Sequence, residues 1–224
     1  MREIVLDTET TGLDPLSGHR IVEIGCVELF NHLPTGEVWH CYLNPERDMP
    51  AEAFRVHGLS AEFLSTHPTF AEKVADFLEF LADTPLVIHN AEFDMRFINA
   101  ELARLGFPPL PAARATDTVA MARKRFPGAQ ANLDALCRRF EIDNTHRTRH
   151  GALLDAELLA EVYLQLIGGR QPGLDLAQAA GIVRAAATVD RPRREPRPHA
   201  PLAAELEAHQ AFIGKIKNAA WTRD

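Results

Sequence analysis

Apolar positions in the first half of the chain alternate as in β-strands and are separated by short polar turns. They predict strands at residues 3–7, 21–30 and 38–43, which the turns would join into an antiparallel meander. A short apolar run at residues 86–89 predicts a buried strand, and a strand-to-helix step is expected around residues 115–125.

Helical periodicity begins after the meander. The tetrapeptide TFAE at residues 69–72 has the pattern of a capping box and opens a helix with one apolar stripe. Further helices are expected at residues 92–105, from Asn132 to residue 139, and at residues 151–167, where a pair of glycines follows. Strands followed by alternating helices and strands indicate an α/β fold with a mixed sheet and helices packed against it.

The length of 224 residues suits one domain with an appendage. Composition changes after the glycine pair, and the stretch 184–201 is rich in Ala, Arg and Pro, which is typical of a linker. We therefore expect a globular domain over residues 1–170, a short docking peptide over 171–176, a flexible linker over 177–201 and a helical tail over 202–224. The tail is too short to build a core alone, so it binds a partner or docks back on its own domain.

Hydrophobic residues make up 46% of the chain and charged residues 25%, which excludes a wholly disordered or fibrous protein. The formal net charge of -7 disfavours binding to a polyanion through overall positive charge. Three widely spaced cysteines predict neither a disulfide framework nor a thiolate zinc site. The sequence shows no secretory signal pattern and no apolar run near the ~20 residues of a membrane span, so we expect a cytoplasmic protein without membrane contact.

Three acidic residues follow predicted strands. Asp7 and Glu9 stand two apart at the end of the first strand and therefore point to the same face of the sheet. A solvated strand-to-turn junction would explain them equally well. Asp94 falls in the first turn of the helix after strand 86–89, where the helix dipole favours a carboxylate, but strand ends are also where α/β proteins build sites.

Asp155 falls inside the last predicted helix near its apolar stripe, where an unpaired carboxylate is costly. His150, at the start of that helix, is either a surface or capping residue or a partner in the same site. Four carboxylates gathered in one pocket repel one another unless cations join them. Two divalent cations about 4 Å apart would support in-line displacement at a phosphate, with His150 accepting a proton from the attacking water.

The segments that carry these residues resemble the three exonuclease motifs of the DEDDh superfamily, in order and spacing: DTET from Asp7, HNAEFD ending at Asp94, and HGALLD from His150 to Asp155. Shorter similarities accompany them, namely VHG at 56–58, FPG at 126–128, LDALC at 133–137 and EIDN at 141–144. Over residues 1–176 the chain resembles the proofreading epsilon-subunit family of bacterial DNA polymerase III. The resemblance implies a ribonuclease H-like five-stranded sheet and 3′-to-5′ removal of nucleoside 5′-monophosphates from a DNA primer end.

The same resemblance implies the roles of individual residues. The metal ligands for two Mg²⁺ or Mn²⁺ ions would be Asp7, Glu9, Asp94 and Asp155, with His150 as the general base. Contacts to the terminal nucleotide are implied for Asp7, Thr8, Glu9, Thr10, Glu52, His57 and Asp155. For His57, packing within a loop is the alternative interpretation.

Partners are implied as well. Gln171, Leu174 and Leu176 resemble the peptide by which replication proteins dock into the sliding clamp, although the last Leu replaces the commoner Phe. Residues 202–224 would bind the replicative polymerase catalytic subunit, and a small accessory subunit would bind the exonuclease domain.

Two other functions stay open at this point: a DEDDh exonuclease that trims RNA 3′ ends, and a non-catalytic linker between clamp and polymerase. A set of basic residues either contacts DNA phosphates beside the site or forms a solvated helix face: Arg123, Lys124, Arg125, Arg138, Arg139, Arg147 and Arg149.

Overall fold

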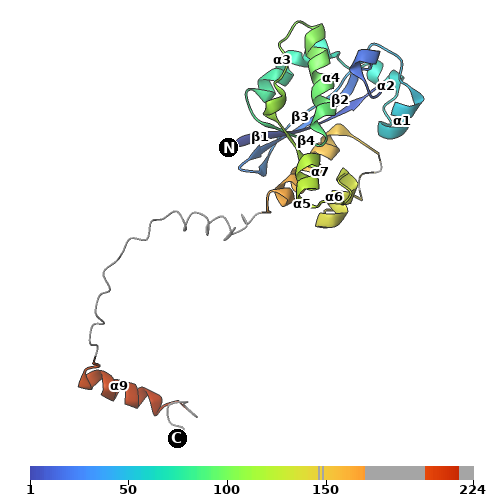
Figure 1. Ribbon diagram of the computed structural model, residues 1–224. Coiled ribbons are helices and arrows are strands. Elements are labelled where there is room, and N and C mark those ends of the chain that lie inside the picture. Colours follow the sequence, from blue (N-terminus) through green and yellow to red (C-terminus); the bar gives the residue numbers. More distant parts are fainter. Residues whose placement is uncertain (146, 148, 170–199, 217–224) are drawn as a thin grey trace. The chain divides into compact units, whose positions relative to one another are not determined.

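The computed structural model describes residues 1–145, 147, 149–169 and 200–216 (Figure 1). Contacts divide the chain into two compact units, Met1–Leu174 and Asp175–Asp224. The expected clamp peptide at 171–176 and most of the expected linker lie outside the described residues. None of the helices in the described ranges is long and apolar enough to cross a membrane.

The first unit is built on one mixed sheet with the strand order β3-β2-β1-β4-β5. Its strands are β1 (Arg2–Thr10), β2 (Ile21–Phe30), β3 (Leu33–Tyr42), β4 (Leu86–Ile88) and β5 (Ala115–Asp117). The pairs β1–β2 and β2–β3 are antiparallel, whereas β4 pairs in parallel with both β1 and β5. This arrangement confirms the predicted meander and the α/β class.

Two strands are longer than their apolar patterns predicted. β1 continues to Thr10 because it stays paired with β2 beyond the apolar run, so Asp7 and Glu9 lie within the strand rather than at its exit. β3 begins at Leu33 because a tight hairpin pairs it with Phe30, and its first six residues are solvent-exposed and carry no clear alternation. In both cases the pairing partner, not the local hydrophobicity, sets the end of the strand.

Five helices agree closely with the predicted ranges: α3 (Phe70–Leu81), α4 (Ala91–Arg104), α5 (Thr118–Arg125), α6 (Leu133–Phe140) and α7 (Ala152–Leu166). A further helix, α9 (Ala203–Ile213), falls within the expected tail 202–224, of which residues 217–224 lie outside the described part. Hydrogen bonds of capping side chains explain where two of these helices, α3 and α6, begin. The Glu72 carboxylate accepts hydrogen bonds from the Thr69 backbone N–H and hydroxyl at 2.7 and 2.9 Å. The Asn132 side chain accepts one from the backbone N–H of Ala135 at 2.8 Å.

The pattern did not predict two short helices, α1 (Ala51–His57) and α2 (Ala61–Ser65). Each spans two turns or fewer, which is too short for a helical period to emerge from the sequence. Two single 3-10 turns, η1 (Pro15–Ser17) and η2 (Ala112–Arg114), complete the described elements of the unit. All three cysteines are free, as expected.

Helices cover both faces of the sheet (Figure 1). One core packs Ile4 and Leu6 against α3 and α4, and the other packs Val5 and Val87 against α5, α6 and α7. Because successive side chains of a strand alternate between faces, Asp7 and Glu9 follow Val5 toward α7, whereas Thr8 follows Leu6 toward α4. The polar side chains at the end of β1 therefore face both helical layers in alternation.

A glycine on β2 allows α7 to come close to the sheet. Gly25 lies opposite Asp7 in the β1–β2 register. A Cβ atom at this position would overlap the backbone of Ala152 and Leu153 at the start of α7. The missing side chain thus brings the first turn of α7 within reach of the acidic end of β1.

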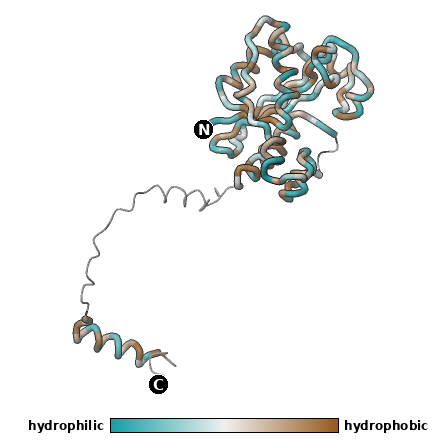
Figure 2. Tube along the Cα trace, in the orientation of Figure 1, coloured by the Kyte–Doolittle hydropathy of each residue, from teal (hydrophilic) through white to brown (hydrophobic). Residues whose placement is uncertain are grey.

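The second unit contains α9, whose apolar side chains remain exposed. Leu202, Leu206 and Phe212 are 69%, 47% and 63% exposed. Hydrophobic and hydrophilic positions alternate along this helix in Figure 2. Groups of exposed apolar side chains often mark protein–protein interaction sites.

We predict that Gly25→Ala lowers the free energy of unfolding by about 1–3 kcal/mol, because the added methyl group forces α7 away from β2. Thermal or urea unfolding measures the change. Gly151→Ala is the matched control, since Gly151 has an extended backbone with φ of -154° and its added methyl would meet nothing within 4 Å. Equal effects of the two substitutions would contradict the close approach at Gly25.

Candidate active site

A cavity of about 250 Å³ lies at the carboxyl ends of β1 and β4. Its lining includes all five residues that the motifs singled out: Asp7, Glu9, Asp94, His150 and Asp155. These residues come from β1, α4 and the segment around the start of α7, so only the folded chain places them together. The carboxyl ends of parallel strands are where α/β proteins usually bind ligands.

The two helical layers hold two of these acids in place. Asp94 stands in the first turn of α4 and is 3% exposed. The Thr8 hydroxyl donates a hydrogen bond of 2.6 Å to its Oδ1 atom, across from β1. Thr8 is buried on the α4 face of the strand, so this bond fixes Asp94 against the sheet while Asp7 and Glu9 face α7.

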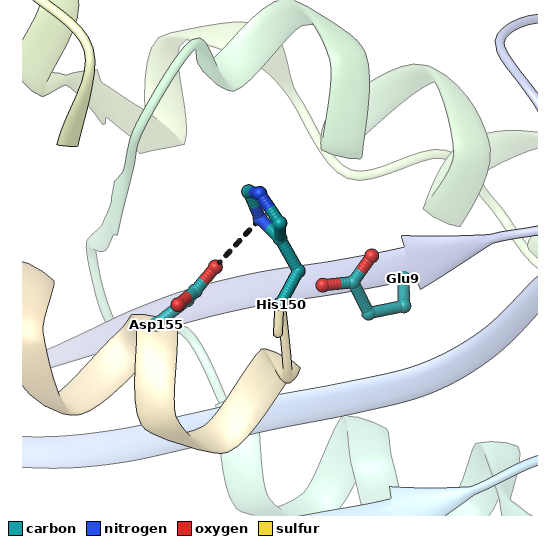
Figure 3. Close-up of side chains that lie close together, drawn as sticks. All are labelled: Glu9, His150 and Asp155. Carbon is teal, nitrogen blue, oxygen red and sulfur yellow. Dashed lines mark hydrogen bonds and ion pairs between the residues drawn. The ribbon is translucent and has the colours of Figure 1, made fainter. Parts of the chain in front are cut away.

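Asp155 and His150 approach from the opposite layer. Asp155 is in the first turn of α7 and 3% exposed, and His150 precedes the helix with its Nδ1 atom 3.2 Å from Asp155 Oδ2. The His150 backbone N–H donates to the Val56 carbonyl at 3.3 Å, which ties this segment to α1. Potential ligand atoms of Glu9, His150 and Asp155 all lie within 4.8 Å of one another, and Figure 3 shows the three side chains converging.

The carboxylates of the cavity do not titrate normally. Burial and the neighbouring carboxylates of Asp94 and Glu9 raise the pKa of Asp7 well above its usual value. Burial and the charge of Asp155 raise the pKa of Glu9 to about 8, and burial raises that of Asp94 to about 7. A site that favours protons on its acids lacks compensating positive charge at those positions.

Asp155 behaves in the opposite way. Burial by itself would raise its pKa, but the hydrogen-bonded guanidinium of Arg147, together with the nearby His150, outweighs burial and lowers the pKa below the usual value. The Arg147 guanidinium contacts both carboxylate oxygens of Asp155, at 2.5 and 2.7 Å. The site is therefore asymmetric, with one carboxylate paired to a cation and the others held apart from one.

The donor set fits a divalent metal. Hard cations such as Mg²⁺ and Mn²⁺ prefer carboxylate oxygens and water as ligands. Acids whose pKa is raised by burial and by neighbouring carboxylates gain stability when a cation neutralises them. The residues that would hold such ions are Asp7, Glu9, Asp94 and Asp155.

A second cavity of about 620 Å³ adjoins the acidic one and shares Thr8, Glu9 and Phe93 with it. The remaining residues expected to contact a terminal nucleotide also line it: Thr10, Glu52 and His57. His57 is buried at 6% exposure, its Nδ1 accepts a hydrogen bond from the Leu59 backbone N–H at 3.1 Å, and burial lowers its pKa. Glu52 differs, because its side chain is 91% exposed at the rim.

The basic residues of the expected flanking set have different roles. Arg147 is 7% exposed and belongs to the site itself. Arg125 donates to the carbonyls of Gln165 and Leu166, and the Arg139 guanidinium lies 4.6 Å from the centre of the Phe126 ring, so both stabilise the α5–α7 layer. The pattern treated Arg147 as one of seven similar cations. Its place in the same segment as His150 and Asp155 was the available signal.

The fold and the site define an exonuclease. The family model of exonucleases named RNase_T matches residues 4–163. A solved structure of the nuclease domain of 3′hExo, a DEDDh family member bound to rAMP, superposes with a TM-score of 0.65 at 17% identity, covering 74% of this chain and 91% of that one. The DEDDh exonuclease class depends in general on divalent metal ions.

Similar proteins of known name identify the family of the chain within the exonucleases. The DNA polymerase III subunit epsilon of Rickettsia conorii is 48% identical over 236 residues, which cover 99% of each chain. The subunit epsilon of Escherichia coli K12 is 51% identical over 176 residues, which cover 75% of this chain and 72% of the relative. The chain therefore belongs to the family of DNA polymerase III epsilon subunits, within the exonucleases.

We predict that the metal-free protein becomes less stable as the pH rises from about 5 to about 8. Over this range the folded state keeps protons on Glu9 and Asp94, whose pKa values are about 8 and 7, whereas the unfolded chain has released them. The folded state therefore binds more protons, and its free energy of unfolding falls with pH. Thermal unfolding in EDTA at several pH values measures the slope.

Glu9→Gln should flatten this slope, because it removes a carboxyl group whose pKa is raised to about 8 in the folded state. Glu52→Gln serves as the control, since its exposed side chain leaves the slope unchanged. Stability that rises with pH in EDTA between pH 5 and 8, or an equal slope in Glu9→Gln and the parent, would refute the assignment.

Proposed function

We propose that this protein removes nucleotides from the 3′ end of a DNA primer by metal-assisted hydrolysis, as the proofreading subunit of a replicative DNA polymerase. The observation that carries the proposal is the single cavity that gathers Asp7, Glu9, Asp94, His150 and Asp155 from separate elements. The family of the chain supports the same activity. A linker without catalysis would not need five convergent catalytic positions.

Two divalent cations, Mg²⁺ or Mn²⁺, would be held by the four carboxylates and would supply activation of water and stabilisation of charge on the phosphate. Secondary structure and a hydrogen bond hold the carboxylate side chains in place. Glu9 is fixed by β1, Asp94 by the bond from Thr8, and Asp155 by the first turn of α7.

His150 is the proposed general base. It is 48% exposed at the mouth of the cavity, which leaves it accessible to an attacking water. Its position 3.2 Å from Asp155 orients the imidazole toward the carboxylates. The water oxygen that loses a proton to this ring would form a bond to phosphorus, and the bond from phosphorus to the 3′ oxygen of the preceding nucleotide would break. That oxygen would take up a proton as the new 3′ hydroxyl, so a nucleoside 5′-monophosphate and a strand shortened by one nucleotide are released.

The adjoining cavity would hold the terminal nucleotide. Thr8, Thr10 and His57 line its inner wall and Glu52 its rim, and the shared residues connect it to the acidic cavity. The larger cavity is therefore the natural place for a sugar and base whose phosphate lies among the carboxylates. Exonuclease X, which shares the fold with a TM-score of 0.59 at 22% identity, has been solved in complex with 5′ overhanging duplex DNA, which supports a DNA substrate for this chain.

The proposal extends to partners. Gln171, Leu174 and Leu176 would dock into the sliding clamp, and residues 202–224 would fold on the polymerase catalytic subunit, through the apolar side chains of α9. A small accessory subunit would bind the exonuclease domain. With this substrate and these partners, the protein would act in the cytoplasm.

We predict that His150→Ala lowers the single-turnover rate of excision by about 10²- to 10⁴-fold, the range of a general base, and that Asp155→Asn abolishes excision. A labelled primer with a mispaired 3′ end reports the rate at saturating Mn²⁺. His209→Ala, on the exposed α9, is the control and keeps the parent rate.

Circular dichroism should show an unchanged fold in each variant, and EDTA should silence the parent reversibly. Full activity of metal-saturated His150→Ala would rule out its role as base, and His146→Ala would then test the neighbouring histidine, which lies outside the described residues. A higher rate on RNA than on DNA ends would favour an RNA-trimming exonuclease.

A second experiment separates the two docking segments. Deletion of residues 177–224 should abolish co-elution with the polymerase subunit while excision by the remaining chain continues. Gln171→Ala with Leu174→Ala should weaken clamp binding and leave polymerase binding unchanged. Retained co-elution after the deletion would refute the tail assignment, and unchanged clamp affinity of the double variant would refute the clamp assignment.

A further inference from the structure

Arg147 occupies the centre of a network of side chains at the mouth of the acidic cavity. Its Nε and Nη2 atoms donate to the two carboxylate oxygens of Asp155, at 2.5 and 2.7 Å. Nη1 donates to Asp134 Oδ1 at 2.7 Å, and Nη2 lies 2.6 Å from His150 Nδ1. One guanidinium thus contacts two residues of the proposed catalytic set, Asp155 and His150, together with one acid from α6.

This pairing uses the carboxylate that a metal would need. A bidentate guanidinium engages both oxygens of Asp155 along the plane of the carboxylate, where a cation would also coordinate. The Arg147 and Asp155 side chains are 7% and 4% exposed, so water screens the pair poorly. Arginine does not lose its proton in proteins, so the site can free Asp155 only if the side chain moves.

The contact with His150 has a similar consequence. An arginine N–H can only donate, so Nδ1 of His150 accepts from Arg147 and its lone pair is engaged. The neutral imidazole then carries its proton on Nε2 and offers no free nitrogen to an attacking water. In this arrangement Arg147 contacts both Asp155 and His150.

Asp134 provides a position to which the guanidinium can withdraw. It stands in the first turn of α6, and its carboxylate is 47% exposed and already bonded to Arg147. If Arg147 releases Asp155, it keeps this partner and gains access to solvent, so no charge is left buried and unpaired. In such a movement the Arg147 side chain would rotate while α6 and α7, which pack in one core, keep their places.

We propose that Arg147 is an internal counter-cation that competes with the divalent metal for Asp155, so that metal binding displaces the guanidinium and releases His150 for catalysis. This inference rests on the proposed metal site. Competition by Arg147 makes the apparent affinity for the metal lower than the affinity of molecules in which Asp155 is free. The apparent affinity is reduced in proportion to the fraction of such molecules. Arg147 is a positioning residue, because it acts through Asp155 and His150.

The test is Mn²⁺ binding to the full chain, measured by titration calorimetry and by the paramagnetic resonance of free Mn²⁺. Arg147→Met removes the competing charge and should tighten the apparent Kd about tenfold, the size of a typical coupling between sites. Arg147→Lys keeps a charge but loses the bidentate fork, so its Kd should fall between those of the parent and Arg147→Met.

Arg149→Met is the matched control. Arg149 is an exposed arginine two residues after Arg147 in the same segment, so this substitution removes the same charge. The control should change the Kd less than Arg147→Met does, because no competition with Asp155 is relieved. Thermal unfolding supplies a second measurement: Arg147→Met should lower the Tm in EDTA, and saturating Mn²⁺ should restore most of the difference.

The outcomes separate this inference from the function on which it rests. Tighter Mn²⁺ binding in Arg147→Met than in Arg149→Met supports competition. If Arg147→Met binds Mn²⁺ no more tightly than Arg149→Met, and the parent binds Mn²⁺ normally, the inference is overturned and the metal site stays in place. Absence of Mn²⁺ binding to the parent would overturn both. If Arg147→Met does not fold, Arg147→Lys decides by the same criterion.

Discussion

Mutual repulsion among carboxylates is the constraint on which the rest of this structure depends. Asp7, Glu9, Asp94 and Asp155 share one small cavity, and burial strengthens the repulsion between them. Only rigid, buried elements can hold such groups together, which explains why the acids stand on the central strand β1 and in the first turns of two packed helices. The stability of the core on both faces of the sheet offsets the unfavourable electrostatics of the site.

The structure relieves this repulsion in two ways. Glu9 and Asp94 have raised pKa values and so favour their protonated forms, whereas Asp155 stays ionised against Arg147. Under the proposals above, divalent cations would take the place of the protons and of the guanidinium.

The acidity of the protein also fits its family. A formal net charge of -7 gives little general attraction to DNA. An exonuclease carried by a polymerase does not need such attraction, because tethering supplies a high local concentration of the primer end. Under the proposed function, the exposed apolar side chains of α9 would supply that attachment.

The sequence by itself determined the α/β class, most helix and strand positions and the five acidic and histidine positions of the site, because periodicity, capping and motifs act over neighbouring residues. It did not determine the short helices α1 and α2, the full lengths of β1 and β3, or the roles of Gly25 and Arg147. Those depend on pairing and packing between distant segments. Gly25 matters only because α7 crosses β2 there, and Arg147 only because its loop lies over Asp155. Tertiary structure alone decided which of seven similar cations neutralises the buried acid.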